Sequence, residues 1–186
     1  MQTVINIFTI FGSLLGIFAF LMTIFSSFHE HNIKKWEKLS SLIDFNDFND
    51  FCYGGVSIGI IYSNTSNKFR DLIRLIRNDS EEIQFKGLAK KKIEKLFSEI
   101  LSETDKFYSV VQAPEWDVWR EDRDDIERKI NKDYFDKKTD TRYEYSRQVD
   151  KSIKNATDHI EKIIRLYREI YSLSNRLPYE FLIKKI

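Results

Sequence analysis

This chain of 186 residues contains little cysteine, proline or glycine, and its positive and negative charges nearly balance. The single cysteine, Cys52, excludes an intrachain disulfide framework and a cysteine-rich zinc site. Only 2 Pro and 6 Gly, with 42% hydrophobic residues, argue against a disordered chain. The 30 Lys and Arg residues balance 29 Asp and Glu residues, which argues against nucleic-acid binding driven by bulk charge. The balance does not argue against a local basic patch that binds nucleic acid.

Charge is entirely missing from residues 1–28, and positions 4–25 form one uncharged, mostly apolar run. As a helix this run extends about 33 Å, enough to cross the hydrocarbon core of a bilayer. A cleaved signal peptide would need a basic start, a shorter apolar region and a small-residue cleavage site. The chain has none of these, so we predict an uncleaved transmembrane helix in residues 1–30 and a separate domain in residues 31–186.

The cations that flank the apolar run predict its orientation. No Lys or Arg precedes the run, whereas Lys34, Lys35 and Lys38 follow it closely. The positive-inside rule then places the N-terminus outside and residues 31–186 in the cytoplasm, as a single-pass protein of the inner membrane. A lone cysteine agrees with a reducing compartment.

One stripe of the predicted membrane helix is made of small and polar residues at alternating spacings of three and four: Asn6, Thr9, Ser13, Gly16, Phe20, Thr23 and Ser27. Gly12 lies beside it and forms a Gly-x-x-x-Gly motif with Gly16. Small residues allow close helix packing in lipid, and polar side chains bond across such interfaces. The stripe predicts a homo-oligomer, packed either dry or around a water-filled pore; a chance pattern is the alternative.

The domain after the membrane helix reads as an all-α bundle of four or five helices. Apolar residues at helical spacing over 32–43 predict either a continuation of the first helix or an amphipathic helix along the membrane exit. Further helices are expected from the cap candidates in residues 63–66 to a break at residues 78–80, then over 80–113 and over 141–175. Ser80 is expected to cap the third of these segments. Residues 51–62 are expected to form a buried helix or a re-entrant segment. The Asp- and Asn-rich residues 44–50 suit a helix cap better than a calcium loop, and the charge-dense residues 115–140 show no strand alternation.

The densest basic cluster lies in the predicted helix over 80–113: Lys86, Lys90, Lys91, Lys92 and Lys95. Such a cluster suits RNA, a nucleotide or anionic lipid, and a plainly solvated helix face is the alternative. No metal site or cofactor is expected, and no catalytic triad or phosphate-binding loop can be assembled.

A short stretch of the last helix resembles the motif of HEPN-type ribonucleases. That motif holds an Arg, a polar residue, three variable residues and a His on one helix, and two copies meet across a dimer. The positions are filled here by Lys154, Asn155 and His159. Lys binds phosphate less well than the Arg it replaces, so the resemblance implies a degenerate motif and no enzyme.

The layout of the whole chain is similar to that of membrane effectors and accessory proteins of prokaryotic antiviral systems. The pore-forming accessory proteins of type VI (RNA-targeting) CRISPR loci share the single N-terminal span, the small helical domain and a degenerate HEPN-like motif. This resemblance implies an oligomeric membrane protein that acts in defence.

Three hypotheses of function follow. The first is an oligomeric membrane protein that forms or gates a pore or perturbs the inner membrane, as an effector or accessory factor in antiviral defence. Its partners would be the bilayer, further copies of itself and a protein, RNA or nucleotide activator. The second is a membrane-tethered HEPN-like ribonuclease or RNA- or nucleotide-sensing domain. The third is a passive membrane-anchored scaffold.

Overall fold

The computed structural model describes residues 2–78, 82–122, 125–139 and 141–175, with side chains described throughout except at 2–11, 63–65, 119–122 and 125–126. The fold is mostly helical, as predicted, and a small three-stranded sheet joins the helices. In chain order the elements are α1 (Gln2–Leu42), α2 (Phe45–Tyr53), η1 (Val56–Ile58), β1 (Ile60–Ile61), α3 (Ser63–Asn78), η2 (Gly87–Ala89), α4 (Lys90–Val111), β2 (Trp116–Asp122), β3 (Asp125–Ile130), α5 (Lys132–Asp136) and α6 (Arg142–Asn175).

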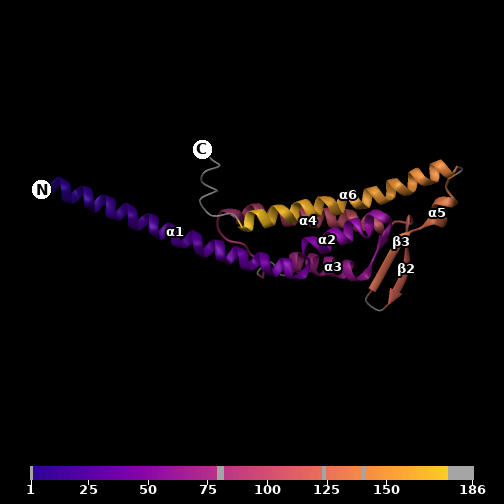
Figure 1. Cartoon of the computed structure of the whole chain (residues 1–186), viewed down its shortest axis with the longest axis horizontal. Helices are drawn as coiled ribbons and strands as arrows, with labels where there is room; N and C mark the ends of the chain where they lie inside the picture. The colour runs from indigo at the N-terminus through magenta and orange to yellow at the C-terminus, as the bar shows by residue number, and fades with distance from the viewer. Residues whose placement is uncertain (1, 79–81, 123–124, 140, 176–186) are drawn as a thin grey trace.

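A single helix, α1, contains both the apolar N-terminal run and the first segment of the domain. Its 41 residues extend about 60 Å at 1.5 Å per residue. Figure 1 shows its N-terminal half projecting from the molecule and its C-terminal part lying against the other helices. The predicted continuation of the apolar helix into the domain is therefore confirmed, up to Leu42.

The core of the domain forms where α1, α3 and the antiparallel pair of α4 and α6 meet (Figure 1). Lys92 on α4 pairs with Glu169 on α6, and further along Glu103 pairs with His159, which defines the antiparallel register. The buried face of α6 repeats at helical spacing and consists of Ala156, Ile160, Ile163, Ile164, Leu166, Tyr167, Ile170 and Leu173. Each fully buried aliphatic side chain stabilises the fold by about 1.5–3 kcal/mol relative to an exposed one.

The aspartate-rich segment after α1 starts a new helix. The Asp44 carboxylate accepts a hydrogen bond from the Asp47 amide at 2.7 Å, and the Asp47 carboxylate accepts one from the Asp44 amide at 3.1 Å. This reciprocal capping box confirms the predicted cap. The expected helix over 51–62 is wrong beyond Tyr53, because the chain turns at Gly54 and Gly55 into η1 and β1.

The prediction that the domain contains no strands is also wrong. β2 and β3 form an antiparallel hairpin, and β1 pairs with the other edge of β3 in the order β1-β3-β2. In this register Asp117 lies opposite Lys129, and Arg120 lies opposite Glu127. Opposite charges on paired strands stabilise a sheet, but the same register sets Asp122 opposite Asp125, so charge pairing alone does not explain the hairpin. Trp116 is buried, and the side chain of Trp119 lies outside the described ones.

The helix expected over 80–113 begins only at Lys90. Ile83 is buried in a non-helical turn, and Leu88 is 60% exposed, although the sequence pattern put both on one helix face. Gly87 adopts φ +70°, a left-handed conformation that stops a helix from continuing through it. Ser80, the predicted cap, lies outside the described residues.

Candidate functional site

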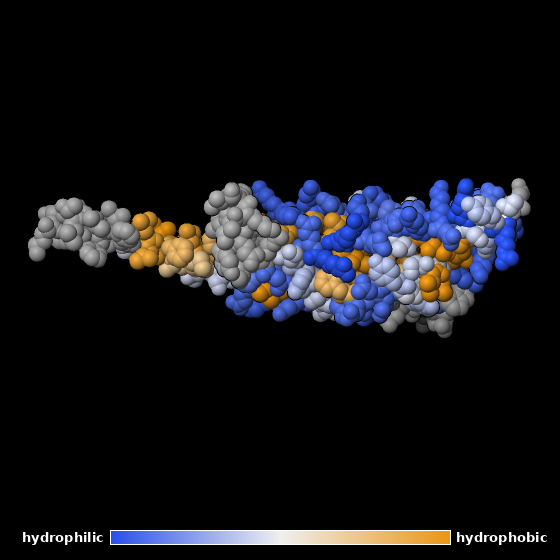
Figure 2. Space-filling model, turned by 45° about the horizontal axis from the view of Figure 1, so that its top comes forward, coloured by the Kyte–Doolittle hydropathy of each residue, from blue (hydrophilic) through white to orange (hydrophobic). Residues whose placement is uncertain are grey.

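The N-terminal half of α1 carries a continuous exposed apolar surface, here called the apolar arm (residues 12–23). Every side chain in it is exposed, among them Leu15 at 66%, Phe18 at 62% and Phe20 at 66%. Figure 2 shows this hydrophobic arm standing out from a mostly hydrophilic body. The helix is long and apolar enough to cross a membrane, and none of its apolar stretch is buried within the molecule. An exposed apolar surface of this extent marks an interaction site.

The central part of the predicted stripe, Ser13, Gly16, Phe20 and Thr23, lies within this exposed surface together with Gly12. A Cβ added at Gly12 or Gly16 would meet no heavy atom within 4 Å, so both backbones are open to close approach by another helix. The Thr23 hydroxyl donates to the Ala19 carbonyl at 2.9 Å, which satisfies its hydrogen inside the helix. Ser13 is exposed on the same stretch. Asn6 and Thr9 lie in α1, but their side chains are outside the described ones.

The arm is joined to the domain through an aromatic cluster at the other end of α1. The Trp36 ring centroid lies 4.8 Å from that of Tyr167 and 5.1 Å from that of Tyr171. The Tyr167 hydroxyl donates to the Ile43 carbonyl at 3.1 Å, and burial raises the pKa of this phenol. Leu39 is fully buried in the same core. The unbroken helix therefore couples the arm rigidly to α6.

Residues 82–89, here called the strap, run alongside α1 just beyond the arm. The Asn32 side chain donates to the Lys86 carbonyl at 3.1 Å and accepts from the Lys86 amide at 2.8 Å. Gly87 lies against the Phe28 ring, since a Cβ at Gly87 would be 2.9 Å from Phe28 Cδ2. Both backbone groups of Lys86 are thus bonded by one side chain of α1.

Three further polar side chains of α1 bind the start of the strap. His31 Nε2 donates to the Gln84 carbonyl at 2.9 Å. Lys35 Nζ donates to the Glu82 carbonyl at 2.7 Å, and Lys38 forms an ion pair with the Glu82 carboxylate. The Lys38 contact lowers the pKa of Glu82 through a hydrogen bond and through charge.

The predicted basic cluster lies at the end of the strap and the start of α4. Its members are Lys86, Lys90, Lys91, Lys92 and Lys95. Three of its members face carboxylates: Lys92 Nζ is 2.7 Å from Glu169, and the Lys90 and Lys95 ammonium groups are 3.8 and 3.7 Å from carboxylates one turn further on. Lys86 and Lys91 are exposed. The cluster is therefore partly neutralised, and the two members without a carboxylate partner among the described residues are Lys86 in the strap and Lys91 at the start of α4.

A buried carboxylate in the α4–α6 interface organises the surroundings of His159. Glu103 is 4% exposed, and its oxygens accept hydrogen bonds from Lys106 Nζ at 2.7 Å, Lys162 Nζ at 2.8 Å and His159 Nδ1 at 2.9 Å. These donors, Lys106 first, lower the pKa of Glu103 to about 2. Glu103 therefore stays ionised and fixes the orientation of the imidazole.

The HEPN-like trio is only partly brought together. Asn155 and His159 lie one turn apart on the side of α6 that faces α4, with Asn155 in a cleft and His159 on Glu103. Lys154 is exposed and does not line that cleft. An imidazole oriented by a carboxylate suits acid–base chemistry. The cations that share Glu103 with His159 are Lys106 and Lys162, and Lys154, the cation of the motif, has no described contact with the imidazole.

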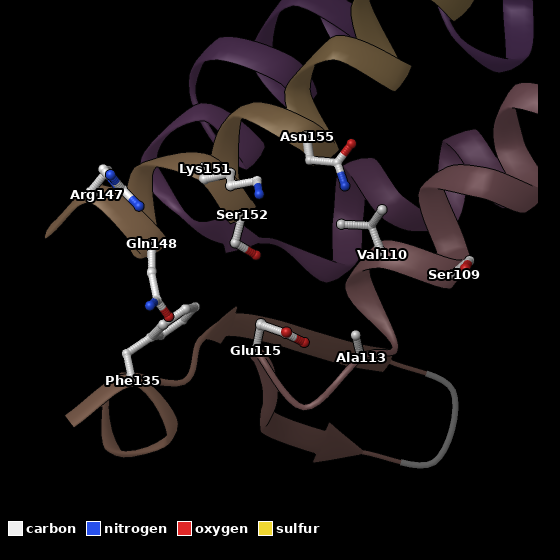
Figure 3. Close-up of a pocket in the computed structure, with 10 residues that line it drawn as sticks. All are labelled: Ser109, Val110, Ala113, Glu115, Phe135, Arg147, Gln148, Lys151, Ser152 and Asn155. Carbon is white, nitrogen blue, oxygen red and sulfur yellow. The ribbon is translucent and has the colours of Figure 1, made fainter. Parts of the chain in front are cut away.

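The cleft that contains Asn155 has a volume of about 480 Å³ and lies between α6, the end of α4 and the chain that leads into β2 (Figure 3). It is lined by Ser109, Val110, Ala113, Glu115, Phe135, Arg147, Gln148, Lys151, Ser152 and Asn155. The Tyr134 hydroxyl donates to Glu115 Oε1 at 3.4 Å, and Glu115 Oε2 is buried with no hydrogen-bond partner among the described atoms. Because that oxygen is buried, the cleft offers an incoming ligand mainly the polar side chains of α6.

The sequence did not single out Asn32 or Glu103, yet both carry a register signal. Asn32 follows Phe28 and precedes Trp36 at a spacing of four, and Glu103 stands in the apolar series of α4 between Ile100 and Phe107. A polar residue in an apolar register is buried when its helix packs, so it needs bonding partners there. In the described part of the chain no group of three His, Cys, Asp or Glu side chains is placed to hold a metal ion.

Comparisons with known proteins found no relative of this chain. It matches no protein-family model, and neither a curated protein nor a solved structure is significantly similar to it.

Proposed function

We propose that this protein is a single-pass membrane protein whose apolar arm crosses the bilayer and self-associates into a pore, and whose helical domain, on the cytoplasmic side, gates that pore or couples it to a partner. The observation that carries the proposal is the exposure of every described side chain from Gly12 to Thr23 on a helix that is continuous with the domain core. Such a surface is costly in water and favourable in lipid.

The orientation rests on the cations that follow the arm. Lys34, Lys35 and Lys38 lie on one side of the apolar run, and residues 1–28 contain no charged residue. Two of these lysines also bind the strap, so they have a structural role besides any topological one. The positive-inside rule counts cations whatever else they bind, and it favours a cytoplasmic domain in the inner membrane.

Self-association is supported by the open stripe of the arm. Gly12 and Gly16 allow a second helix to approach closely, and Ser13 adds a hydroxyl to the same surface. A stripe of small and polar residues facing lipid would lose these contacts. Copies arranged in a ring would direct the stripe inward, where hydroxyls suit a water-filled pore. The layout shared with antiviral membrane proteins provides a setting for such a pore.

The experiment that tests this proposal is the mass of the detergent-solubilised protein by native mass spectrometry, for the wild type and for Gly16→Leu. We expect a defined ring of several copies for the wild type and smaller species for the variant, because a bulky side chain blocks close approach. Leu14→Phe enlarges a 57% exposed side chain away from the stripe and is the matched control.

Rings should also conduct ions in planar bilayers, and Gly16→Leu should lose that conductance. A wild-type monomer, or a mass that Gly16→Leu and Leu14→Phe change equally, would reject self-association through the stripe. Stable rings without conductance would reject the pore and leave a membrane-anchored scaffold.

A further inference from the structure

We infer that the tip of the strap, Leu88 with the flanking Lys86 and Lys91, is a second membrane contact that binds the headgroup region of an anionic bilayer. The inference rests on the proposed function, because it requires the apolar arm to be inserted. It adds a surface of the folded domain to the membrane interface and names the lipid chemistry that this surface suits.

The depth of the strap in the bilayer follows from its position along the axis of α1. The uncharged apolar run ends at Phe25, and Phe28, which contacts Gly87, is three residues further along the helix. At 1.5 Å per residue this is about 5 Å along the axis. The headgroup layer is roughly 5–8 Å thick on each side of the hydrocarbon core. With the apolar run in the hydrocarbon, Gly87 and its neighbour Leu88 lie at headgroup depth.

The exposure of Leu88 is imposed by the strap. Its neighbours in the strap are anchored, with Ile83 3%, Phe85 2% and Ala89 3% exposed, whereas Leu88 is 60% exposed. The Phe85 and Phe97 ring centroids are 6.1 Å apart, which ties the strap to α4. The fold therefore holds one large apolar side chain outward at the end of the domain from which the arm leaves.

The charge around Leu88 favours an anionic surface. Lys86 and Lys91 are exposed, and the structure describes no carboxylate partner for either. Each cation close to an anionic membrane contributes about 1 kcal/mol. An apolar side chain inserted among headgroups with flanking lysines is the usual pattern of interfacial anchors. Because the strap is bound to α1, this contact would set the tilt and rotation of the whole domain.

The test is lipid quenching of a fluorophore placed at position 88 in the full chain, as Leu88→Cys in a Cys52→Ala background. The matched control is Ile58→Cys, since Ile58 is 58% exposed and lies beside β1, next to the cleft lined by Lys132. A third label, Ile17→Cys, reports insertion of the arm. The vesicles contain phosphatidylcholine alone or with about a quarter phosphatidylglycerol, each with headgroup-labelled and chain-labelled quenchers.

We expect headgroup quenching at position 88 to exceed that at position 58 by about twofold or more, and to increase with phosphatidylglycerol. Lys86→Glu with Lys91→Glu should remove the increase, whereas Lys132→Glu with Lys137→Glu should not. If position 17 is quenched and position 88 behaves like position 58, the inference is overturned and the proposed insertion stands. If position 17 is not quenched by labelled chains, the proposed function itself fails. Quenching at 88 that does not respond to anionic lipid or to the lysine variants would overturn the charge recognition.

Discussion

At the scale of single residues, two polar side chains hold positions where the helical pattern calls for apolar ones. Glu103 collects three cationic or imidazole donors inside the α4–α6 interface, and Asn32 bonds both backbone groups of Lys86. A buried polar group is tolerable only with such partners, because its lost hydration must be replaced. Both residues therefore fix where distant parts of the chain meet.

Replacing Glu103 with Gln should destabilise the domain by about 2 kcal/mol at pH 7, since the charge-assisted bonds from Lys106, Lys162 and His159 are lost. The pKa of Glu103 is lowered from 4.5 to about 2 in the folded protein. Its stabilising effect is therefore complete above the unfolded value and is lost as the pH falls from about 4.5 towards 2. Denaturant unfolding of wild type and variant over this range measures the difference.

The control for Glu103 is Glu99→Gln on the same helix. The Glu99 carboxylate lies 3.7 Å from Lys95 Nζ, and its side chain is 41% exposed. We expect a change below about 0.5 kcal/mol, as for other exposed pairs. A stability gap between Glu103→Gln and wild type that persists undiminished at pH 2 would contradict the ionic role of Glu103.

Asn32→Ala should free the strap from α1. The Lys86 amide would lose its acceptor, so its hydrogen exchange should accelerate more than that of the amides in α4, and global stability should fall by about 1–2 kcal/mol. Asn46→Ala, at an exposed position of α2, is the control. Exchange at Lys86 that is equally fast in the wild type would show that the Asn32 bonds do not hold the strap.

At the scale of elements, the sheet connects segments that lie far apart in the sequence. β1 pairs with β3 through Ile60 opposite Lys129 and Ile61 opposite Arg128. The Ile130 amide donates to the Gly59 carbonyl at 2.9 Å and continues this pairing into the turn. Gly59 adopts φ +77° there, a conformation that few other residues tolerate.

Gly59→Ala should destabilise the domain by about 1–3 kcal/mol. The added Cβ would combine an unfavourable φ with a position 2.9 Å from Ile130 Cγ1 and 3.2 Å from Ile153 Cδ1. Gly12→Ala meets nothing within 4 Å and should leave the unfolding free energy of the domain unchanged. Equal unfolding midpoints for the two variants in thermal or denaturant unfolding would refute the role given to Gly59.

At the scale of the whole molecule, one helix belongs to two environments. α1 is exposed and apolar over residues 12–23 and packs into the core around Trp36 and Leu39. No described break separates the two parts of α1. Movement of the apolar arm is therefore expected to move α6 through the contacts of Trp36 with Tyr167 and Tyr171.

Four glycines inserted after Ser27 should uncouple the domain from the span without unfolding it. In vesicles of phosphatidylcholine alone, which lack the anionic lipid that the strap is inferred to bind, anisotropy decay of a dye on the domain should gain a fast component, because a glycine linker is a flexible coil. Replacing Ser26 and Ser27, both exposed, with Ala keeps the helix and is the control. Unchanged slow tumbling of the glycine variant would show that other membrane contacts fix the domain.

The sequence predicted the elements whose signals are local. The uncharged run at the start of the chain, the capping residues from Asp44 and the long amphipathic α6 were all readable from spacing and composition. It failed at β2 and β3, where the many charged residues around Trp116 and Val118 obscure the alternation of a strand. It also extended α4 through the strap, because Ile83 falls at helical spacing from later apolar residues.

By itself, then, the sequence determined which segments are apolar, that most of the chain is helical and where α2 begins, since these depend on neighbours within a few turns. Only the tertiary structure decided that the strap lies on α1, that Glu103 meets His159 and that β1 completes the sheet. Those contacts join residues far apart in the sequence: 54 positions for Asn32 and Lys86, 56 for Glu103 and His159, and 69 for Ile60 and Lys129. Their free energy exists only when the chain has brought both partners together, so no local pattern could reveal it.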